Sequence, residues 1–312
     1  MKRTIFGVVA SVLVVTLGGL FVLLGRTQVV QVADGAHVLR TSNGIAEIGA
    51  NVTVLSGDQG LILVDTQLAP LARRLRRIVA KQWTVPVRTV VNSHWHPDHT
   101  GGNELLGDGI DIVAHPSVQD RMTKQQEGFG LTKPGSHHTF EPRSVAALPT
   151  ALVSDAIELT VGHGGVHVQH VSGAHTDGDL VVYADGPGVL VIGDLVWPGS
   201  FPFIDVHNGG SAAGLSRALE EILGWLPSET VVVPGHGPAM TTRELIEYST
   251  MVRQTLELIE QMHTDGIPVD DAQIRGLPAD WERWSSRLVP TSEWIRMVYA
   301  SFEPGSDPSP AR

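Results

Sequence analysis

Short apolar and alternating runs of residues predict a β-rich first half of the chain, beginning at Gln28. The spacing of apolar positions and turn residues predicts strands over 29–32, 36–40, 45–48, 51–56, 60–65, 87–91 and 110–114. Helical periodicity predicts helices over 70–82 and 117–127. The stretch 128–148 is rich in Gly, Pro, Ser and His, which predicts a long loop of the kind that often covers an active site.

The second half of the chain repeats this pattern. Apolar runs predict strands over 156–160, 166–172, 180–184, 188–192 and 230–233. Helices are predicted over 211–225, 242–262, 281–287 and 292–302. Thr241 and Glu244 have the spacing of a capping box, which marks the start of the second of these helices. Two β-rich halves, each followed by helices, predict two packed sheets with helices outside them.

The first 27 residues have a different composition. Lys2 and Arg3 precede an uncharged stretch over residues 5–25, and Arg26 follows it. A helix at about 1.5 Å per residue over this stretch is long enough to cross roughly 30 Å of hydrocarbon. The stretch is longer than the apolar region of a secretory signal, and no small-x-small cleavage site follows it. These features predict an N-terminal transmembrane helix.

Membrane contact through residues 5–25 implies a single-pass protein of the cell membrane. The positive amino end should stay in the cytoplasm, which places the catalytic domain outside the cytoplasm. A cleaved signal that leaves a secreted or periplasmic domain is the first alternative, and a buried helix is the second.

The composition narrows the possible chemistry. The chain has 312 residues, of which 42% are apolar, and this suits one large domain or two small ones. It has no cysteine, so disulfides and thiolate metal sites are excluded, and any metal must be held by His and carboxylates. The net charge of −11 argues against nucleic acid as a partner. The basic run over residues 73–77 is interpreted as the solvated face of a helix.

The stretch "VVNSHWHPDHTGG" places three histidines and an aspartate directly after a predicted buried strand. His94 and His96 alternate along an extended strand end, so they point to the same side. Asp98 and His99 follow Pro97, which ends the strand and bends the chain. This geometry can send the first pair to one metal ion and the second pair to a neighbouring one.

Three later residues have the same setting at the end of an apolar run, framed by glycine. They are His175, Asp194 and His236. If all three lie at the same edge of the sheets as the first motif, the ligand set contains seven residues. Seven ligands exceed the needs of one tetrahedral ion and fit two metals that share a carboxylate. Nitrogen and carboxylate ligands suit Zn²⁺, with Fe or Mn as alternatives.

The order of these residues resembles that of the metallo-β-lactamase fold superfamily over roughly residues 28–262. The resemblance implies an α+β fold, a four-layer αβ/βα sandwich with the metals at one edge. It implies that His94, His96 and His175 hold the first metal, that Asp98, His99 and His236 hold the second, and that Asp194 bridges them. Asp65 matches a buried aspartate of the family that supports the metal-binding loop, and a simple turn residue at a strand end is the alternative.

The composition of the two ends and this resemblance together predict three segments. Residues 1–27 are the predicted membrane anchor or signal segment, and residues 28–303 are the predicted metallo-β-lactamase-like domain with a C-terminal helical region. The tail over 304–312 is rich in Pro and Ser and is predicted to be disordered.

Two metals in this arrangement predict hydrolysis of a small molecule. Two cations close together lower the pKa of a bridging water and hold the hydroxide against the carbonyl of an ester, thioester, lactone or lactam. Asp98 is the predicted catalytic residue, because it can accept a proton or orient the nucleophile. The bridging Asp194 resembles the ligand set of glyoxalase II and the general hydrolase branches of the superfamily. The prediction is therefore a metallo-hydrolase with two Zn²⁺.

Two other functions stay open at the level of sequence. A mononuclear iron redox enzyme of the persulfide-dioxygenase type shares the histidine motif, although a complete second ligand set argues against it. A non-catalytic metal-binding accessory protein is the third hypothesis. The aromatic residues predicted to contact a substrate are Trp95, Trp197, Phe201 and Phe203, for which ordinary packing is the alternative.

Overall fold

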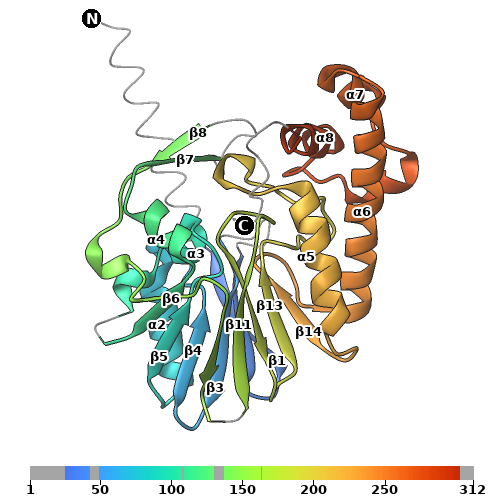
Figure 1. The fold of residues 1–312 in the computed structure, drawn as a ribbon. Helices are drawn as coiled ribbons and strands as arrows, with labels where there is room; N and C mark the ends of the chain where they lie inside the picture. The colour runs from blue at the N-terminus through green and yellow to red at the C-terminus, as the bar shows by residue number, and fades with distance from the viewer. Residues whose placement is uncertain (1–24, 43–48, 107–108, 130–136, 163, 303–312) are drawn as a thin grey trace, which may run out of the picture.

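Two β-sheets lie face to face, and helices cover much of their outer faces (Figure 1). This arrangement is seen in a computed structural model that describes residues 25–42, 49–106, 109–129, 137–162 and 164–302. The predicted layering of two sheets between outer helices is therefore confirmed. The strand predicted over 45–48 and the tail over 304–312 lie outside the described residues.

The first sheet has seven strands in the order β1-β2-β3-β4-β5-β6-β9. Their bounds are β1 Arg26–Ala33, β2 Ala36–Ser42, β3 Val52–Gly57, β4 Gly60–Val64, β5 Val87–Val91, β6 Asp111–Ala114 and β9 Ala151–Leu152. β1 to β4 pair antiparallel, whereas β4, β5, β6 and β9 run parallel. Parallel neighbours need a crossover, which the helix α2 (Ala69–Gln82) supplies between β4 and β5.

α2 has one apolar face and one basic face. Leu71, Leu75 and Val79 are buried, while Arg73, Arg76 and Arg77 are exposed. The interpretation of the basic run as a solvated helix face is confirmed for these three arginines.

The second sheet has six strands in the order β10-β11-β12-β13-β14-β15. Their bounds are β10 Ala156–Thr160, β11 Gly165–Val171, β12 Asp179–Ala184, β13 Val189–Gly193, β14 Val231–Pro234 and β15 Met240–Thr241. Only β13 and β14 are parallel among these neighbours, and α5 (Ala212–Trp225) connects them. α6 (Thr242–Thr264) begins at the predicted capping box of Thr241 and Glu244. The chain then forms α7 (Val269–Arg275), the 3₁₀ turn η4 (Ala279–Trp284) and α8 (Thr291–Ala300).

An aliphatic core, rich in valine, joins the two sheets. It includes Val38, Ile62 and Val91 from the first sheet and Val168, Val182 and Val191 from the second. Each fully buried side chain of this size contributes about 1.5–3 kcal/mol relative to an exposed one, so this core holds the two sheets in a fixed alignment. The loops at the edge of the sandwich are positioned by that alignment.

The predicted helix over 117–127 and the predicted loop over 128–148 need correction. The helix α4 (Pro116–Met122) ends earlier, and β7 (Gln126–Phe129) pairs with β8 (His137–Phe140) as a hairpin. Both strands are polar and lack the apolar alternation that signals a half-buried strand, so the pattern gave no strand signal. The remaining short elements are α3 (Pro97–Thr100), η1 (Asn103–Leu105), η2 (Val145–Ala147) and η3 (Val206–Asn208).

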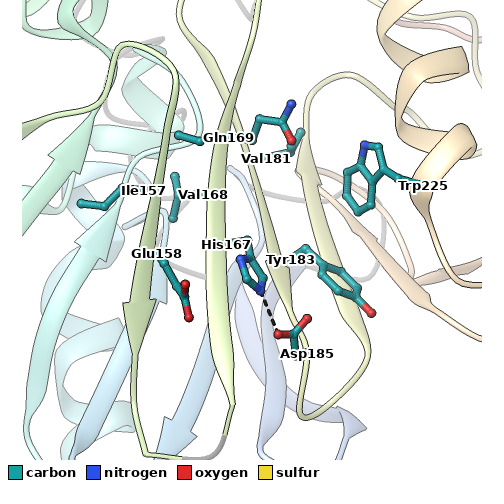
Figure 2. Close-up of a pocket in the computed structure, with 10 residues that line it drawn as sticks. Ile157, Glu158, His167, Val168, Gln169, Val181, Tyr183, Asp185 and Trp225 are labelled. Atoms are coloured by element: carbon teal, nitrogen blue, oxygen red, sulfur yellow. Dashed lines mark hydrogen bonds and ion pairs between the residues drawn. The ribbon is translucent and has the colours of Figure 1, made fainter.

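A groove of about 490 Å³ lies over β10, β11 and β12 on the outer face of the second sheet. Figure 2 shows the side chains that line it, with His167 and Asp185 joined by a hydrogen bond of 2.8 Å between Nε2 and Oδ2. Trp225 lies at the end of α5, and its ring meets that of Tyr183 edge to face at the side of the groove. Among the residues that line it, none belongs to the predicted ligand set.

The predicted membrane location is contradicted. Within the part of the chain that the structure describes, no helix combines the length and the apolar composition that crossing a bilayer requires. The longest of these helices, α6, has 23 residues but is amphipathic, because it packs one face against the core and carries charged residues on the other. The predicted anchor over residues 5–25 lies outside the described residues except for Gly25.

Candidate metal centre

Four strand ends bring the seven predicted ligands to one edge of the sandwich. In the first sheet, His94 and His96 follow β5, and Asp98 and His99 lie in the short helix α3. The remaining three follow strands of the second sheet: His175 after β11, Asp194 after β13 and His236 after β14. Their side chains form two groups, each with ligand atoms within 4.8 Å of one another.

The first group contains three imidazole nitrogens that converge on one point. Nδ1 of His96 lies 2.9 Å from Nε2 of His94 and 3.1 Å from Nε2 of His175. Donor atoms on a tetrahedral zinc ion with Zn–N bonds of about 2.0–2.1 Å lie roughly 3.3 Å apart. The spacing of the three nitrogens is therefore close to that of a metal-binding set.

Burial keeps two of these imidazoles neutral. Burial, and then the neighbouring His99, His96 and His175, lower the pKa of His94 well below its usual value. Burial and then His96 lower the pKa of His175 to about 4. A neutral imidazole has a lone pair free for a cation, so these two nitrogens have the protonation state that metal binding requires.

The second group contains Asp98, His99 and His236. Nε2 of His236 lies 3.2 Å from Oδ2 of Asp98, and Nε2 of His99 lies 3.8 Å from the same oxygen. Burial alone would raise the pKa of Asp98, but His99 and His236 lower it to about 2. The buried carboxylate is therefore ionised at neutral pH. Against the effect of burial, Asp194 and the other carboxylates in turn raise the pKa of His99 well above its usual value and that of His236 to about 10. A divalent cation bound here would therefore take the place of the imidazolium protons.

Asp194 lies between the two groups. Its Oδ1 is 3.3 Å from Nε2 of His99, and its Oδ2 is 4.0 Å from Nε2 of His175. Oδ1 of Asp194 and Nε2 of His99 are buried and have no hydrogen-bond partner. These two atoms have only each other, as an ion pair at 3.3 Å, and a metal ion bound to both would satisfy them more fully. The residues present therefore fit a pair of metal ions that share Asp194.

A family model described as the metallo-beta-lactamase superfamily matches residues 46–236. This chain belongs to that superfamily. It shares the fold and the His/Asp cluster of a superfamily of metallo-hydrolases, and this cluster is able to bind metal ions.

Individual relatives of this superfamily member have diverse names. An uncharacterised protein of Mycobacterium leprae is 31% identical over 173 residues, which cover 54% of this chain and 76% of the relative. A hydroxyacylglutathione hydrolase of Nitrosococcus oceani is 27% identical over 170 residues, which cover 54% of this chain and 55% of the relative. The predicted likeness to the glyoxalase II branch is confirmed by such relatives.

Two solved structures show the same fold at low sequence identity. The inverting sec-alkylsulfatase Pisa1 from Pseudomonas sp. is 18% identical with a TM-score of 0.70, and the match covers 88% of this chain and 50% of that one. A metallo-beta-lactamase from Pontibacter korlensis is 20% identical with a TM-score of 0.57, and the match covers 73% of this chain and 99% of that one. The matches span only about half the length of the hydrolase and the sulfatase.

Asp65 holds the loop that carries the candidate ligands in place, so it is more than a turn residue at a strand end. It follows β4, and its carboxylate accepts hydrogen bonds of 2.8 Å from both the backbone N–H and the hydroxyl of Ser93. Its Oδ2 also lies 2.8 Å from Nδ1 of His99. Asp65 has a φ of 67°, a left-handed conformation that is rare outside glycine, and such strain is typical of functional sites.

Gly235 is required by the packing between the two groups. A Cβ atom at this position would overlap Oδ1 of Asp194 and would crowd the ring of His99. The glycine next to His236 therefore makes room for the carboxylate of Asp194 rather than for a turn.

The predicted substrate-contact residues divide into two pairs. Trp197 and Phe203 are half-buried beside the ligands: Trp197 stacks on His236 with ring centres 4.4 Å apart, and Phe203 lies 5.8 Å from His175. Trp95 is buried and packs against Phe140. Phe201 is also buried, in the helical core, so ordinary packing is the correct interpretation for these two.

The sequence analysis missed Asp205, whose Oδ2 lies 2.9 Å from Nε2 of His96. Asp205 lies in an irregular segment between β13 and α5, where no periodicity indicates which side chain faces the ligands. A signal existed in the concentration of Asp, Asn and two glycines in "FIDVHNGG", which indicates a constrained turn.

Proposed function

We propose that this protein is a dinuclear metal-dependent hydrolase that cleaves an ester, thioester, lactone or lactam of a small molecule. The observation that carries the proposal is the pair of ligand groups joined by Asp194. In this proposal the first metal is held by His94, His96 and His175, the second by Asp98, His99 and His236, and Asp194 bridges them. Zn²⁺ suits these nitrogen and carboxylate ligands, with Fe or Mn as alternatives.

Two divalent cations at this site would activate water at neutral pH and polarise the bond to be cleaved. The protein's own contribution begins with Asp98, whose ionised carboxylate is available to accept a proton or to orient the attacking water. Asp65 holds the loop that carries His99 and keeps that ring at a fixed angle. Because these groups are held in fixed positions, less entropy is lost on reaching the transition state.

The residues beside the ligands support a substrate that carries an apolar group. The ring of Trp197 lies beside the second ligand group, and the ring of Phe203 lies beside the first. Aromatic walls of this kind bind apolar groups and leave the few polar groups of the site to orient the reacting bond. Relatives named hydroxyacylglutathione hydrolases support a thioester or a related acyl compound as the substrate.

The test is a substrate panel measured on protein whose metal content has been quantified. The panel contains chromogenic esters, thioesters, lactones, β-lactams and alkyl sulfates. We expect two metal ions per chain and turnover of at least one acyl substrate. Turnover of alkyl sulfates alone would refute the proposed substrate class. One iron per chain with oxygen uptake on a persulfide would refute the hydrolase, and loaded protein that turns over nothing would favour an accessory role.

A pair of histidine variants links turnover to the site. His96→Ala should remove bound metal and abolish hydrolysis while the domain stays folded, because His96 is at the centre of the first group. His167→Ala is the matched control, since this histidine is half-exposed in the groove of Figure 2 and also pairs with an aspartate. Its activity and metal content should equal those of the wild type.

A further inference from the structure

We infer that the segment over residues 203–210 positions two ligands of the first metal, with Asp205 as the residue that fixes the orientation of His96. This inference rests on the proposed function only in taking His96 and His175 as metal ligands. Asp205 is a positioning residue, because it acts through His96 rather than on the substrate.

The contact between Asp205 and His96 selects the nitrogen that faces the first group. Oδ2 of Asp205 lies 2.9 Å from Nε2 of His96, and the aspartate side chain is only 2% exposed. With the Nε2 proton donated to the carboxylate, Nδ1 of His96 is left without a proton and points at Nε2 of His94 and of His175. A carboxylate on the outer nitrogen of a ligating histidine is a common way of fixing both tautomer and ring angle.

The same segment also holds His175. Nδ1 of His175 donates a hydrogen bond of 2.8 Å to the carbonyl of Phe203, which leaves its Nε2 free toward the first group. The backbone N–H of Asp205 donates to the carbonyl of His175 at 3.0 Å. His96 comes from the first sheet and His175 from the second, so this one segment aligns ligands from both halves of the sandwich.

Asp205 is itself held by a second layer of hydrogen bonds. Nδ2 of Asn208 donates to Oδ2 of Asp205 at 2.8 Å, and Nη1 of Arg121 donates to Oδ1 of Asn208 at 2.6 Å. Arg121 lies on α4 and also pairs with Asp177, two residues beyond His175. The chain from Arg121 through Asn208 to Asp205 therefore leaves the carboxylate little freedom to rotate.

Two glycines allow the segment to pack this closely. Gly209 has a φ of 81°, which favours glycine, and a Cβ atom there would crowd the side chain of Asp177. A Cβ atom at Gly210 would overlap the carbonyl of His175. The backbone of the segment is thus fitted against the loop that carries His175.

The test compares Asp205→Asn and Asp205→Ala with Asp185→Ala in the full chain. Asp185 is the matched control, because it pairs with His167 at 2.8 Å on an exposed part of the sheet shown in Figure 2. Binding of Zn²⁺ is measured by competition with a chromogenic chelator, and the metal-free proteins are compared by thermal melting. We expect Asp205→Ala to weaken the binding of one of the two ions by about 10–100-fold. Asp185→Ala should not change either affinity.

The conservative variant and a spectroscopic readout separate positioning from a general structural effect. Asp205→Asn keeps an oxygen that can accept from His96, so it should restore most of the affinity. With Co²⁺ in place of Zn²⁺, Asp205→Ala should alter the visible absorption of one ion and leave that of the other unchanged. Equal losses of both ions with a lowered melting temperature would show a structural role and overturn the inference, as would unchanged affinities in Asp205→Ala.

These measurements do not depend on turnover, so the two proposals can fail separately. Wild-type protein that binds two ions but hydrolyses nothing would refute the proposed function and leave the inference standing on the affinities. Wild-type protein that binds no metal would refute both.

Discussion

Replacing Asp65 by alanine should destabilise the metal-free protein by about 2–6 kcal/mol, because its carboxylate satisfies donors that are buried with it. Its oxygens lie 2.8 Å from the Ser93 N–H, the Ser93 hydroxyl and Nδ1 of His99. Without the carboxylate, Nδ1 of His99 can donate to the hydroxyl oxygen of Ser93, 3.2 Å away. The backbone N–H and the hydroxyl of Ser93 would be left without an acceptor, and each costs about 1–3 kcal/mol when buried and unpaired.

Asp65→Asn separates the effect of the lost hydrogen bonds on stability from the effect of the backbone conformation. Asn tolerates the left-handed φ of 67° better than most residues, so the turn after β4 should survive. The amide oxygen can still accept from Ser93, but its NH₂ group then faces Nδ1 of His99. Only one donor loses its acceptor, and the expected loss falls to about 1–3 kcal/mol.

The assay is urea unfolding of metal-free protein, followed by tryptophan fluorescence. Asp185→Ala is the control, because its carboxylate is 49% exposed and its pair with His167 should contribute less than about 1 kcal/mol. A loss of stability in Asp65→Ala no larger than that of this control would contradict the role of the carboxylate. Equal losses in the Asn and Ala variants at position 65 would also contradict it.

Two further predictions concern residues outside the ligand set and use the same urea titration. Trp294→Ala should lower the free energy of unfolding by about 3–5 kcal/mol, because the ring is fully buried and its Nε1 donates to Thr255. The ring of Trp225 is 41% exposed, and a loss no larger than that of Trp225→Ala would contradict this prediction. Burial and then His170 lower the pKa of His115 to about 4. The unfolded chain takes up this proton near pH 6.5 and the folded chain only near pH 4, so stability should fall between these values as the pH falls. His115→Asn should reduce that fall, and an unchanged pH dependence would refute the assignment.

The residues of the candidate site could be predicted from the sequence because their signals are local. His94 and His96 alternate on one strand end, and Asp194 and His236 follow apolar runs and lie next to glycines. At the end of a buried strand such residues have few structural reasons to occur together, so residue type and position indicated a metal site. The assignment of individual residues to two groups came from the resemblance to the superfamily. The layers of the sandwich could be predicted for the same reason, since apolar periodicity reports directly on the buried faces of strands and helices.

Asp205 and the hairpin of β7 and β8 could not be predicted, because each depends on contacts between distant segments. The partner of Asp205 is 109 positions away, and the intervening chain gives no spacing rule. In "SFPF", Phe201 packs in the helical core and Phe203 lies beside the ligands, although both occupy similar positions in the sequence. An irregular backbone has no fixed period, so it gives no rule for which of two neighbouring side chains is buried.

The division of the site between the two sheets links metal binding to the stability of the whole sandwich. Hydrogen bonds of 2.7 Å join the halves next to the ligands, from the N–H of Leu180 to the carbonyl of Ser93 and from the N–H of Asn51 to the carbonyl of Gly235. Separation of the sheets would therefore also separate the ligands. A cation held by residues from both sheets binds only the folded chain, so it would stabilise that state in proportion to the logarithm of its free concentration. The hydrogen bonds of Asp65 and Asp205 act in the same direction, because each fixes a ligand ring before any ion arrives.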